Sequence, residues 1–287
     1  MSQKKYIYAT LLSTPGYLQS IKVLYKSLCK YGKLKYPFVC FCSQGLPEHC
    51  IEELEWYGIE CIRLSSYALT DSTFQEIRSS YSSSKVSHWA YTFDKLFLFG
   101  MEQYDKIVFL DSDMMVLSDI NELFDKPNMS AVQAGRFKYP DWVRLNSGCM
   151  VFTPNKDIEK GLFESILPTI NERASQGLEC GDQDVINYYF NNWPSQGKLH
   201  LPQSYNVFFS WLPEYIERNG ESADIVHFIG GGKPWIYKGP LKEILYLIGL
   251  MRYQKSCVWT YLRYKMLLCK INFTDFLWRH GILKRKG

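Results

Sequence analysis

Segments typical of strands and of helices alternate through the first 110 residues, and this alternation constrains the fold more than any other feature. Aromatic and β-branched residues favour strands at 6–12, 36–42 and 59–64, whereas helical periodicity marks 18–31, 47–57 and 86–101. A strand, a helix and a further strand form a βαβ unit, whose strands are parallel. The sequence therefore predicts an α/β fold with a mostly parallel central sheet, and the serine-rich segment 65–84 is expected to be a loop.

A nearly apolar segment at 106–110, Lys-Ile-Val-Phe-Leu, is expected to be a central strand buried on both faces. It runs into Asp111-Ser112-Asp113. Ligands of open α/β sheets bind at the carboxyl ends of strands, where two carboxylates one residue apart can bind a hard cation such as Mn²⁺ or Mg²⁺. Such a cation would offset the charge of a departing diphosphate. Asp-x-Asp also occurs in ordinary turns, so the motif alone leaves both interpretations open.

Two further polar clusters each fit an ordinary structural role as well as a functional one. Asn146-Ser147-Gly148 precedes the apolar run 149–152, and it could be a turn or offer amide and hydroxyl groups to a sugar. Asp182 opens a helical stretch and could be its N-cap, or could place a carboxylate beside a reacting sugar carbon.

A third cluster, His-Phe-Ile-Gly-Gly-Gly-Lys-Pro-Trp at 227–235, follows a strand-like segment at 224–226. His227 could supply an imidazole ligand to the same cation. Backbone amides of consecutive glycines can approach phosphate oxygens, and Lys233 adds a positive charge. A plain glycine turn is the alternative.

Taken together and in this order, the four clusters resemble those of glycosyltransferase family 8, most closely its glycogenin and galactinol synthase branch, over about residues 5–238. The resemblance implies a GT-A type nucleotide-sugar-binding fold and a UDP-sugar donor. It also implies Mn²⁺, with Mg²⁺ as the alternative, and transfer of a hexose, glucose or galactose being favoured, with retention of anomeric configuration.

The resemblance also implies roles for individual positions. Metal ligands would be Asp111, Asp113 and His227. Catalytic residues would be Asp182, Gln183 and Lys95. Besides these six, the donor would be bound by Ala9, Thr10, Leu11, Tyr17, Ser112, Asn146, Ser147, Gly230 and Lys233. Retention through a covalent intermediate needs a carboxylate close under the anomeric carbon. Asp182 is the candidate, Gln183 is the alternative on the other face of the sugar, and same-face attack also stays open.

Two positions depart from the glycogenin pattern. Glu179 stands where glycogenin has an aspartate, and no tyrosine lies between Tyr205 and Tyr215, where the self-glucosylated tyrosine of glycogenin aligns. We therefore expect a separate acceptor, such as a glycan, a polyol or a protein glycan.

Two other classes of protein fit part of the pattern. A nucleotide-sugar or glycan-binding protein without turnover would keep the same residues. In a haloacid-dehalogenase-type phosphatase a strand also ends in Asp-x-Asp, but that motif continues to Thr or Val, where this chain has Met115.

The last segment differs from the rest in charge. Residues 241–287 hold ten Lys and Arg against Glu243 and Asp275, a net charge of +8, whereas 1–240 carry −4. We place a domain boundary near Pro240, between a catalytic domain (1–240) and a basic, aromatic helical extension (241–287). The spacing puts Val258, Leu262, Met266 and Cys269 on one helical side. This extension could lie on an anionic membrane surface, or pack on the domain with its charges solvated.

Location and partners can be predicted only in outline. The first residues lack the pattern of a secretory signal, and nine cysteines without framework spacing favour reduced thiols. We expect a cytoplasmic protein, with peripheral attachment to the cytosolic face of a membrane as a second possibility. We expect no nucleic-acid partner, and a homodimer stays open.

Overall fold

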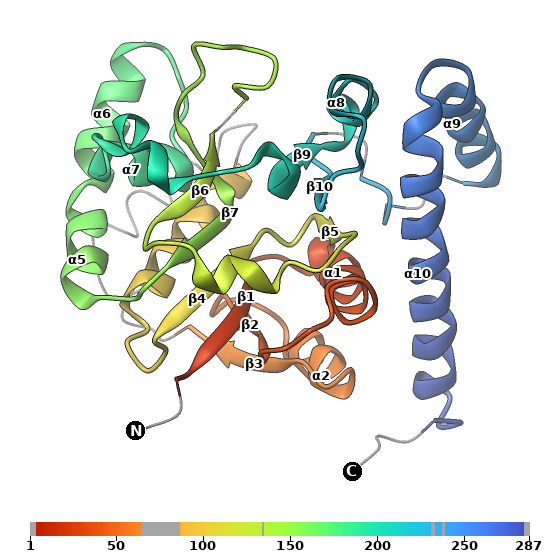
Figure 1. Cartoon of the computed structure of the whole chain (residues 1–287). Coiled ribbons are helices and arrows are strands. Elements are labelled where there is room, and N and C mark those ends of the chain that lie inside the picture. Colours follow the sequence, from red (N-terminus) through yellow and green to blue (C-terminus); the bar gives the residue numbers. More distant parts are fainter. Residues whose placement is uncertain (1–3, 65–86, 134, 231–232, 237–238, 284–287) are drawn as a thin grey trace.

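The structure is a computed structural model that describes residues 4–64, 87–133, 135–230, 233–236 and 239–283. The predicted loop at 65–84 lies outside these residues. A seven-stranded sheet in the order β3-β2-β1-β4-β7-β6-β8 forms the centre (Figure 1). Its strands are β1 (Tyr6–Leu12), β2 (Phe38–Cys42), β3 (Glu60–Arg63), β4 (Lys106–Leu110), β6 (Ser130–Gln133), β7 (Leu145–Phe152) and β8 (His200–Leu201).

Pairing in this sheet is parallel from β3 through β4 and between β6 and β8, and antiparallel on both sides of β7. All its strands except β7 therefore run in one direction, which confirms the predicted mostly parallel sheet. β4 is buried from Ile107 to Leu110, as its apolar sequence predicts. The carboxyl ends of β1 and β4 consequently lie at the same edge, where Asp111 follows.

Helices cover both faces of the sheet. One core contains α1 (Leu18–Lys30) and α2 (Glu48–Trp56), and the other contains the 3-10 helix Ser87–Gly100, α5 (Lys156–Glu164), α6 (Ile166–Ser175) and α7 (Asp182–Tyr189). The helix predicted at 86–101 is thus present, but as a 3-10 helix. Shorter 3-10 turns span Pro15–Tyr17, Asn121–Asp125, Trp193–Ser195, Gly197–Leu199, Gln203–Asn206 and Phe209–Trp211.

A second, three-stranded sheet lies beside the first in the order β5-β10-β9. It consists of β5 (Met114–Val116), β9 (Val207–Phe208) and β10 (Ile225–His227), and α8 (Leu212–Asn219) connects the last two. β10 pairs antiparallel with β5, His227 opposite Met114. This small sheet brings His227 next to the Asp-x-Asp turn, although more than a hundred residues separate them in the chain.

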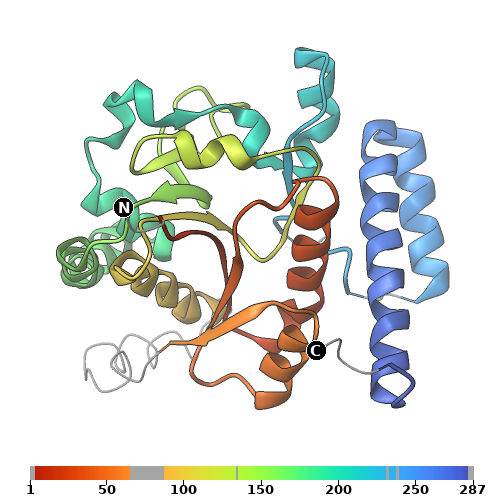
Figure 2. The same ribbon diagram turned by 60° about the horizontal axis from the view of Figure 1, so that its bottom comes forward.

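The C-terminal segment is a hairpin of α9 (Pro240–Tyr253) and α10 (Lys255–Arg279). We call the two sheets with the helices that precede this hairpin the body, and α10 lies between the body and α9 in both views (Figures 1 and 2). One face of α10 is buried against α1 and α8, and its residues belong to the core that contains α1: Cys257, Tyr261, Tyr264, Leu268 and Ile271.

The side of α10 that carries Val258, Leu262, Met266 and Cys269 is not its buried face. Met266 is 59% exposed, and Cys269 is exposed as well. Apolar and aromatic residues lie on several sides of α10, so periodicity does not single out the face that the body covers. Among the described residues, no helix has both the length and the apolar character needed to cross a bilayer.

Candidate active site

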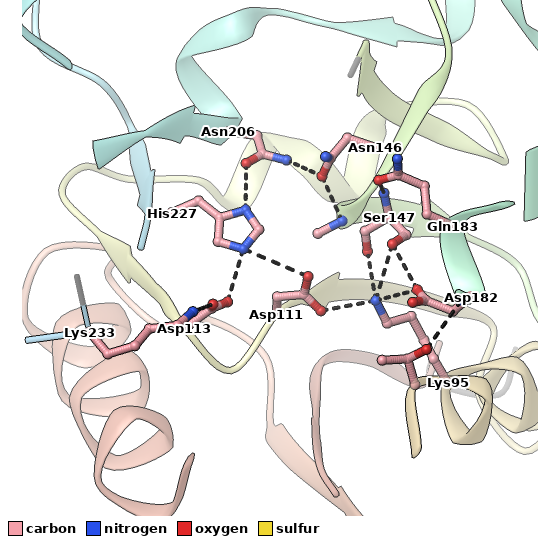
Figure 3. Close-up of polar contacts among 12 residues, drawn as sticks. Lys95, Asp111, Asp113, Asn146, Ser147, Asp182, Gln183, Asn206, His227 and Lys233 are labelled. Carbon is pink, nitrogen blue, oxygen red and sulfur yellow. Dashed lines mark hydrogen bonds and ion pairs between the residues drawn. The ribbon is translucent and has the colours of Figure 1, made fainter. Parts of the chain in front are cut away.

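The two carboxylates and the imidazole converge at the edge of the sheet (Figure 3). Asp111 follows β4, Asp113 precedes β5, and His227 ends β10. His227 Nε2 lies 2.9 Å from Asp113 Oδ1 and 3.8 Å from Asp111 Oδ2. One ligand atom from each residue lies within 4.8 Å of the other two. Two carboxylates and an imidazole are a donor set that suits a divalent cation such as Mn²⁺.

A chain of hydrogen bonds determines which nitrogen of His227 faces the carboxylates. The backbone N–H of Gly148 donates to Asn146 Oδ1 over 2.9 Å, so that atom is an acceptor. The Asn206 amide donates to the same oxygen over 2.6 Å, which turns Asn206 Oδ1 toward His227 Nδ1 at 3.0 Å. Nδ1 must then carry the proton of a neutral ring, which leaves the lone pair of Nε2 facing Asp113. A cation between this lone pair and the carboxylate satisfies both, so the residues fit a metal site.

Lys95 connects the predicted metal ligands to the predicted sugar-binding residues. Its ammonium group lies 3.0 Å from Asp111 Oδ1 and 2.7 Å from Asp182 Oδ2, with only 6% of the side chain exposed. It also donates to the backbone oxygen and the hydroxyl of Ser147, over 3.3 and 3.2 Å. Burial alone lowers the pKa of Lys95, but the two carboxylates outweigh it and hold the pKa above its usual value. The site thus contains a permanent positive charge.

The residues predicted to contact the sugar lie next to this lysine. Ser147 Oγ donates to Asp182 Oδ2 over 2.8 Å, and the Ser147 amide donates to Gln183 Oε1 over 3.2 Å. Two of the structural alternatives left open by the sequence do not hold. Asn146, Ser147 and Gly148 lie within β7 rather than in a turn before it, and Asp182 is the first residue of α7, with Gly181 as its N-cap.

Asp111, Asp113 and His227 form what we call the metal-ligand group. Lys233 lies beside Asp113, on the side of this group opposite to Lys95 (Figure 3). Its Nζ donates to Asp113 Oδ2 over 2.5 Å and to the Phe228 carbonyl over 2.7 Å. The rings of Tyr17 and Trp235 are 5.5 and 5.3 Å from this nitrogen. Burial alone raises the pKa of Asp113, but His227 and Lys233 outweigh it and hold the pKa below its usual range. Burial is also the main reason why the pKa of Asp111 is raised.

A pocket of about 410 Å³ opens over these groups. Its lining includes nine of the predicted site residues: Leu11, Tyr17, Lys95, Asp111, Ser112, Asp113, Ser147, Asp182 and Gln183. The side chains of Ala9 and Thr10 are fully buried and do not line it. Asn146 and His227 do not line the pocket; both belong to the hydrogen-bond chain through Asn206. Gly230 adopts a positive φ of 75°, and the two glycines after it lie outside the described residues.

Several residues of the site were missed from the sequence. Arg173, Asp184 and Thr92 line the pocket, and Asp184 is ion-paired with Arg173 at 3.4 Å. Asp184 could have been found, because it belongs to the same Gly-Asp-Gln-Asp cluster. Asn206 carries no such signal, since only the pairing of β9 with β10 brings it to His227.

Comparison with known proteins identifies the family. The sequence model of glycosyl transferase family 8 matches residues 9–239. The chain belongs to glycosyltransferase family 8. Within the family, glycogenin-1 of Oryctolagus cuniculus is 34% identical over 152 residues, 51% of this chain and 42% of that protein. Galactinol synthase 1 of Solanum lycopersicum is 28% identical over 256 residues, 81% of this chain and 74% of that protein. The chain spans less than half the length of the glycogenin that it matches.

Solved structures confirm the fold expected for the family. The galactosyltransferase LgtC, in complex with donor and acceptor sugar analogues, has a TM-score of 0.58 at 16% identity and covers 92% of this chain and 95% of its own. GlyE of Streptococcus pneumoniae TIGR4 has a TM-score of 0.56 at 18% identity and covers 99% of this chain and 65% of its own. The α/β fold is of the GT-A type.

Proposed function

We propose that this chain is a retaining hexosyltransferase that moves a hexose, glucose or galactose being favoured, from a UDP-sugar to a separate acceptor with the help of Mn²⁺. The observation that carries the proposal is that His227 meets Asp111 and Asp113, from which more than a hundred residues separate it, beside a pocket that the two aspartates line. Lys95 and Lys233 lie on the two sides of this group and add positive charge where a diphosphate would lie. Mg²⁺ is the alternative ion.

The side chains of the metal-ligand group and those beside it then have distinct chemical tasks. Asp111, Asp113 and His227 would hold the ion, which when bound supplies electrostatic stabilisation of the leaving diphosphate. Lys233 would contact the same phosphate oxygens, because its ammonium group already lies beside Asp113. Tyr17 lines the pocket and presents a ring on which a uracil base could stack.

Asp182 and Gln183 would face the sugar. The carboxylate of Asp182 is held by Lys95 and Ser147, so it is oriented before the donor arrives. Gln183 is fixed from β7 by the Ser147 amide. Asp182→Asn separates the two retaining routes, since near-normal turnover would remove Asp182 as a nucleophile and leave same-face attack.

A separate acceptor and a cytoplasmic location are also part of the proposal. Phe209, Ser210 and Trp211 occupy the place where glycogenin's acceptor tyrosine aligns, and none of them can form a tyrosyl glycoside. A glycan, a polyol or a protein glycan therefore remains as the acceptor class. All nine cysteines are free thiols, and six of them are buried, which suits a reducing compartment.

One assay tests the activity directly. The full chain is incubated with UDP-glucose, UDP-galactose and other UDP-sugars, with Mn²⁺, with Mg²⁺ or with a chelator, and the release of UDP is measured. We expect Mn²⁺-dependent release that the chelator abolishes and that Asp111→Asn lowers by about 10²–10³. Binding of UDP-sugar by calorimetry without any release would instead favour the alternative, a nucleotide-sugar-binding protein. If the chain neither bound a UDP-sugar nor released UDP, both the transferase and the binding-protein proposals would be overturned.

A further inference from the structure

Exposed apolar side chains gather on the C-terminal hairpin. Eleven of the 18 large apolar side chains that are exposed in the described residues belong to 240–283. Six of them define what we call the C-terminal apolar face: Ile244, Leu245 and Ile248 of α9, and Trp259, Met266 and Phe273 of α10, with exposed fractions between 48% and 72%. A concentration of this kind marks a surface that something else covers.

Helical spacing shows that these residues are ordered in rows. Trp259, Met266 and Phe273 follow one another at intervals of seven residues, so they form one line along α10. This line lies away from the buried face of α10, which contains Tyr264 and Leu268. In α9, Tyr246 packs on Tyr261 of α10 with ring centres 5.1 Å apart. Ile244 and Ile248 of α9 are exposed to solvent instead. Because α10 lies between the body and α9, the hairpin forms an outer layer of the molecule (Figure 2).

The exposed charges of the hairpin all have the same sign. Within 240–283 the exposed charged residues are Lys242, Arg252, Lys255, Arg263, Lys270 and Arg279. The two acidic residues are turned inward. Glu243 bonds Lys265 at 3.0 Å and accepts from Tyr261, and Asp275 is buried against Lys22 at 2.9 Å. The surface of the hairpin is therefore both apolar and basic.

Basic and apolar side chains alternate at a spacing that suits a lipid interface. Arg263 and Lys270 each follow an apolar residue of the row by four positions, so they lie directly beside it on α10. Long basic side chains in such a position can reach lipid phosphates while the apolar row enters the acyl region. A tryptophan, Trp259, stands at one end of the row, and tryptophan favours this interfacial depth.

We propose that the C-terminal apolar face docks on the surface of an anionic lipid bilayer. The charge distinguishes this occupant from a second copy of the chain. A two-fold dimer through this face would place the same basic residues opposite one another, with no exposed carboxylate of the hairpin to pair with them. None of the six residues of this face lines the pocket of the candidate active site, and the proposal does not depend on the proposed reaction.

Flotation of the full chain with lipid vesicles tests the proposal. We expect flotation with phosphatidylcholine vesicles that contain phosphatidylserine, a decrease with added salt, and little flotation with phosphatidylcholine alone. The double variant Ile244→Gln/Ile248→Gln is expected to bind about tenfold more weakly or worse. Arg263→Gln/Lys270→Gln is expected to lose roughly 30-fold on anionic vesicles.

Matched controls change the same residue types elsewhere. Leu167→Gln/Leu178→Gln replaces two apolar residues that are 47% and 46% exposed on the body, and Lys160→Gln/Lys198→Gln replaces two exposed lysines there. Both should float like the unchanged chain, and thermal melting should show that all variants are folded. Absence of flotation, or unchanged flotation of Ile244→Gln/Ile248→Gln, would overturn the proposal. So would a dimer, seen by light scattering, that dissociates in this variant without any flotation.

Discussion

The imidazole Nδ1 of His227 lies 3.0 Å from the side-chain oxygen of Asn206, and this contact leaves the other ring nitrogen for Asp113 and Asp111. Asn206 forms no hydrogen bond with Asp111 or Asp113 themselves. It acts through the orientation of the ring, as partners behind a metal-binding histidine commonly do.

Replacing Asn206 by alanine should therefore weaken metal binding. The ring of His227 loses the acceptor that fixes its tautomer, and we expect the affinity for Mn²⁺ to fall about 10- to 100-fold. Titration calorimetry with Mn²⁺ measures this without any substrate. Asn146→Ala removes the next link of the same chain, so the effects of the two substitutions should be less than additive. An unchanged affinity in Asn206→Ala would remove this residue from the site.

Gly148 offers a steric test of the same group. A Cβ at this position would lie 2.8 Å from His227 Cε1, 2.9 Å from Asn146 Oδ1 and 2.9 Å from Met114 Cε, so Gly148→Ala must disturb the packing of all three side chains. We expect weaker Mn²⁺ binding and slower turnover with little loss of secondary structure, as judged by circular dichroism. Gly197→Ala is the control, since a Cβ there meets nothing within 4 Å. Equal Mn²⁺ affinity in Gly148→Ala and Gly197→Ala would contradict the close contact of Gly148 with His227 and Asn146.

Much of the fold could be predicted from the sequence, because its local signals agree with the tertiary structure. β1 and β4 have the predicted bounds, since apolar runs ending in polar turns are unambiguous. The Asp-x-Asp turn and His227 could be named because each belongs to a motif. A strand-like segment at 224–226 anticipates β10, but the small sheet could not be derived, since β9 has only two residues and such short strands do not show how they pair.

The side chains that complete the site were hidden for a related reason. Asn206 meets His227 only because β9 lies parallel to β10, with His227 opposite Phe208. The buried face of α10 was hidden because it contains Tyr261, Tyr264 and even Asp275, which a hydrophobicity pattern assigns to solvent. Polar groups become buried there because each of Asp275 and Tyr261 has a specific partner.

Lys95 should contribute strongly to stability as well as to the proposed reaction. Lys95→Met removes the ammonium between Asp111 and Asp182 and leaves one half-buried and one buried carboxylate without it. We expect the free energy of unfolding to fall by about 3–5 kcal/mol, measured by urea titration. Lys156→Met breaks an ion pair with Glu159 at the surface and should change the free energy of unfolding by less than about 1 kcal/mol. Similar values for both variants would show that Lys95 is not the central charge of the site.

A buried cluster of charges attaches α10 to the rest of the molecule. Lys22 of α1 is fully buried and lies 2.9 Å from Asp275 of α10 and 2.9 Å from Glu53 of α2. Tyr57 also donates to Asp275 over 2.7 Å. Lys22→Met leaves both carboxylates without their shared cation, and breaking a buried pair in this way costs about 3–5 kcal/mol.

The effect of Lys22→Met should reach the donor pocket, because α10 supports the segment that carries Lys233. Tyr264 of α10 packs on Phe228 with ring centres 4.9 Å apart, and the Phe228 carbonyl accepts from Lys233. We expect faster amide exchange in 255–279, and weaker binding of UDP in the presence of Mn²⁺, although Lys22 does not line the pocket. Lys26 is a half-buried lysine of the same helix that forms no ion pair within the described part of the chain, and Lys26→Met should leave both quantities unchanged. If exchange in α10 rose while UDP binding stayed constant, the hairpin would stabilise the body without supporting the donor segment.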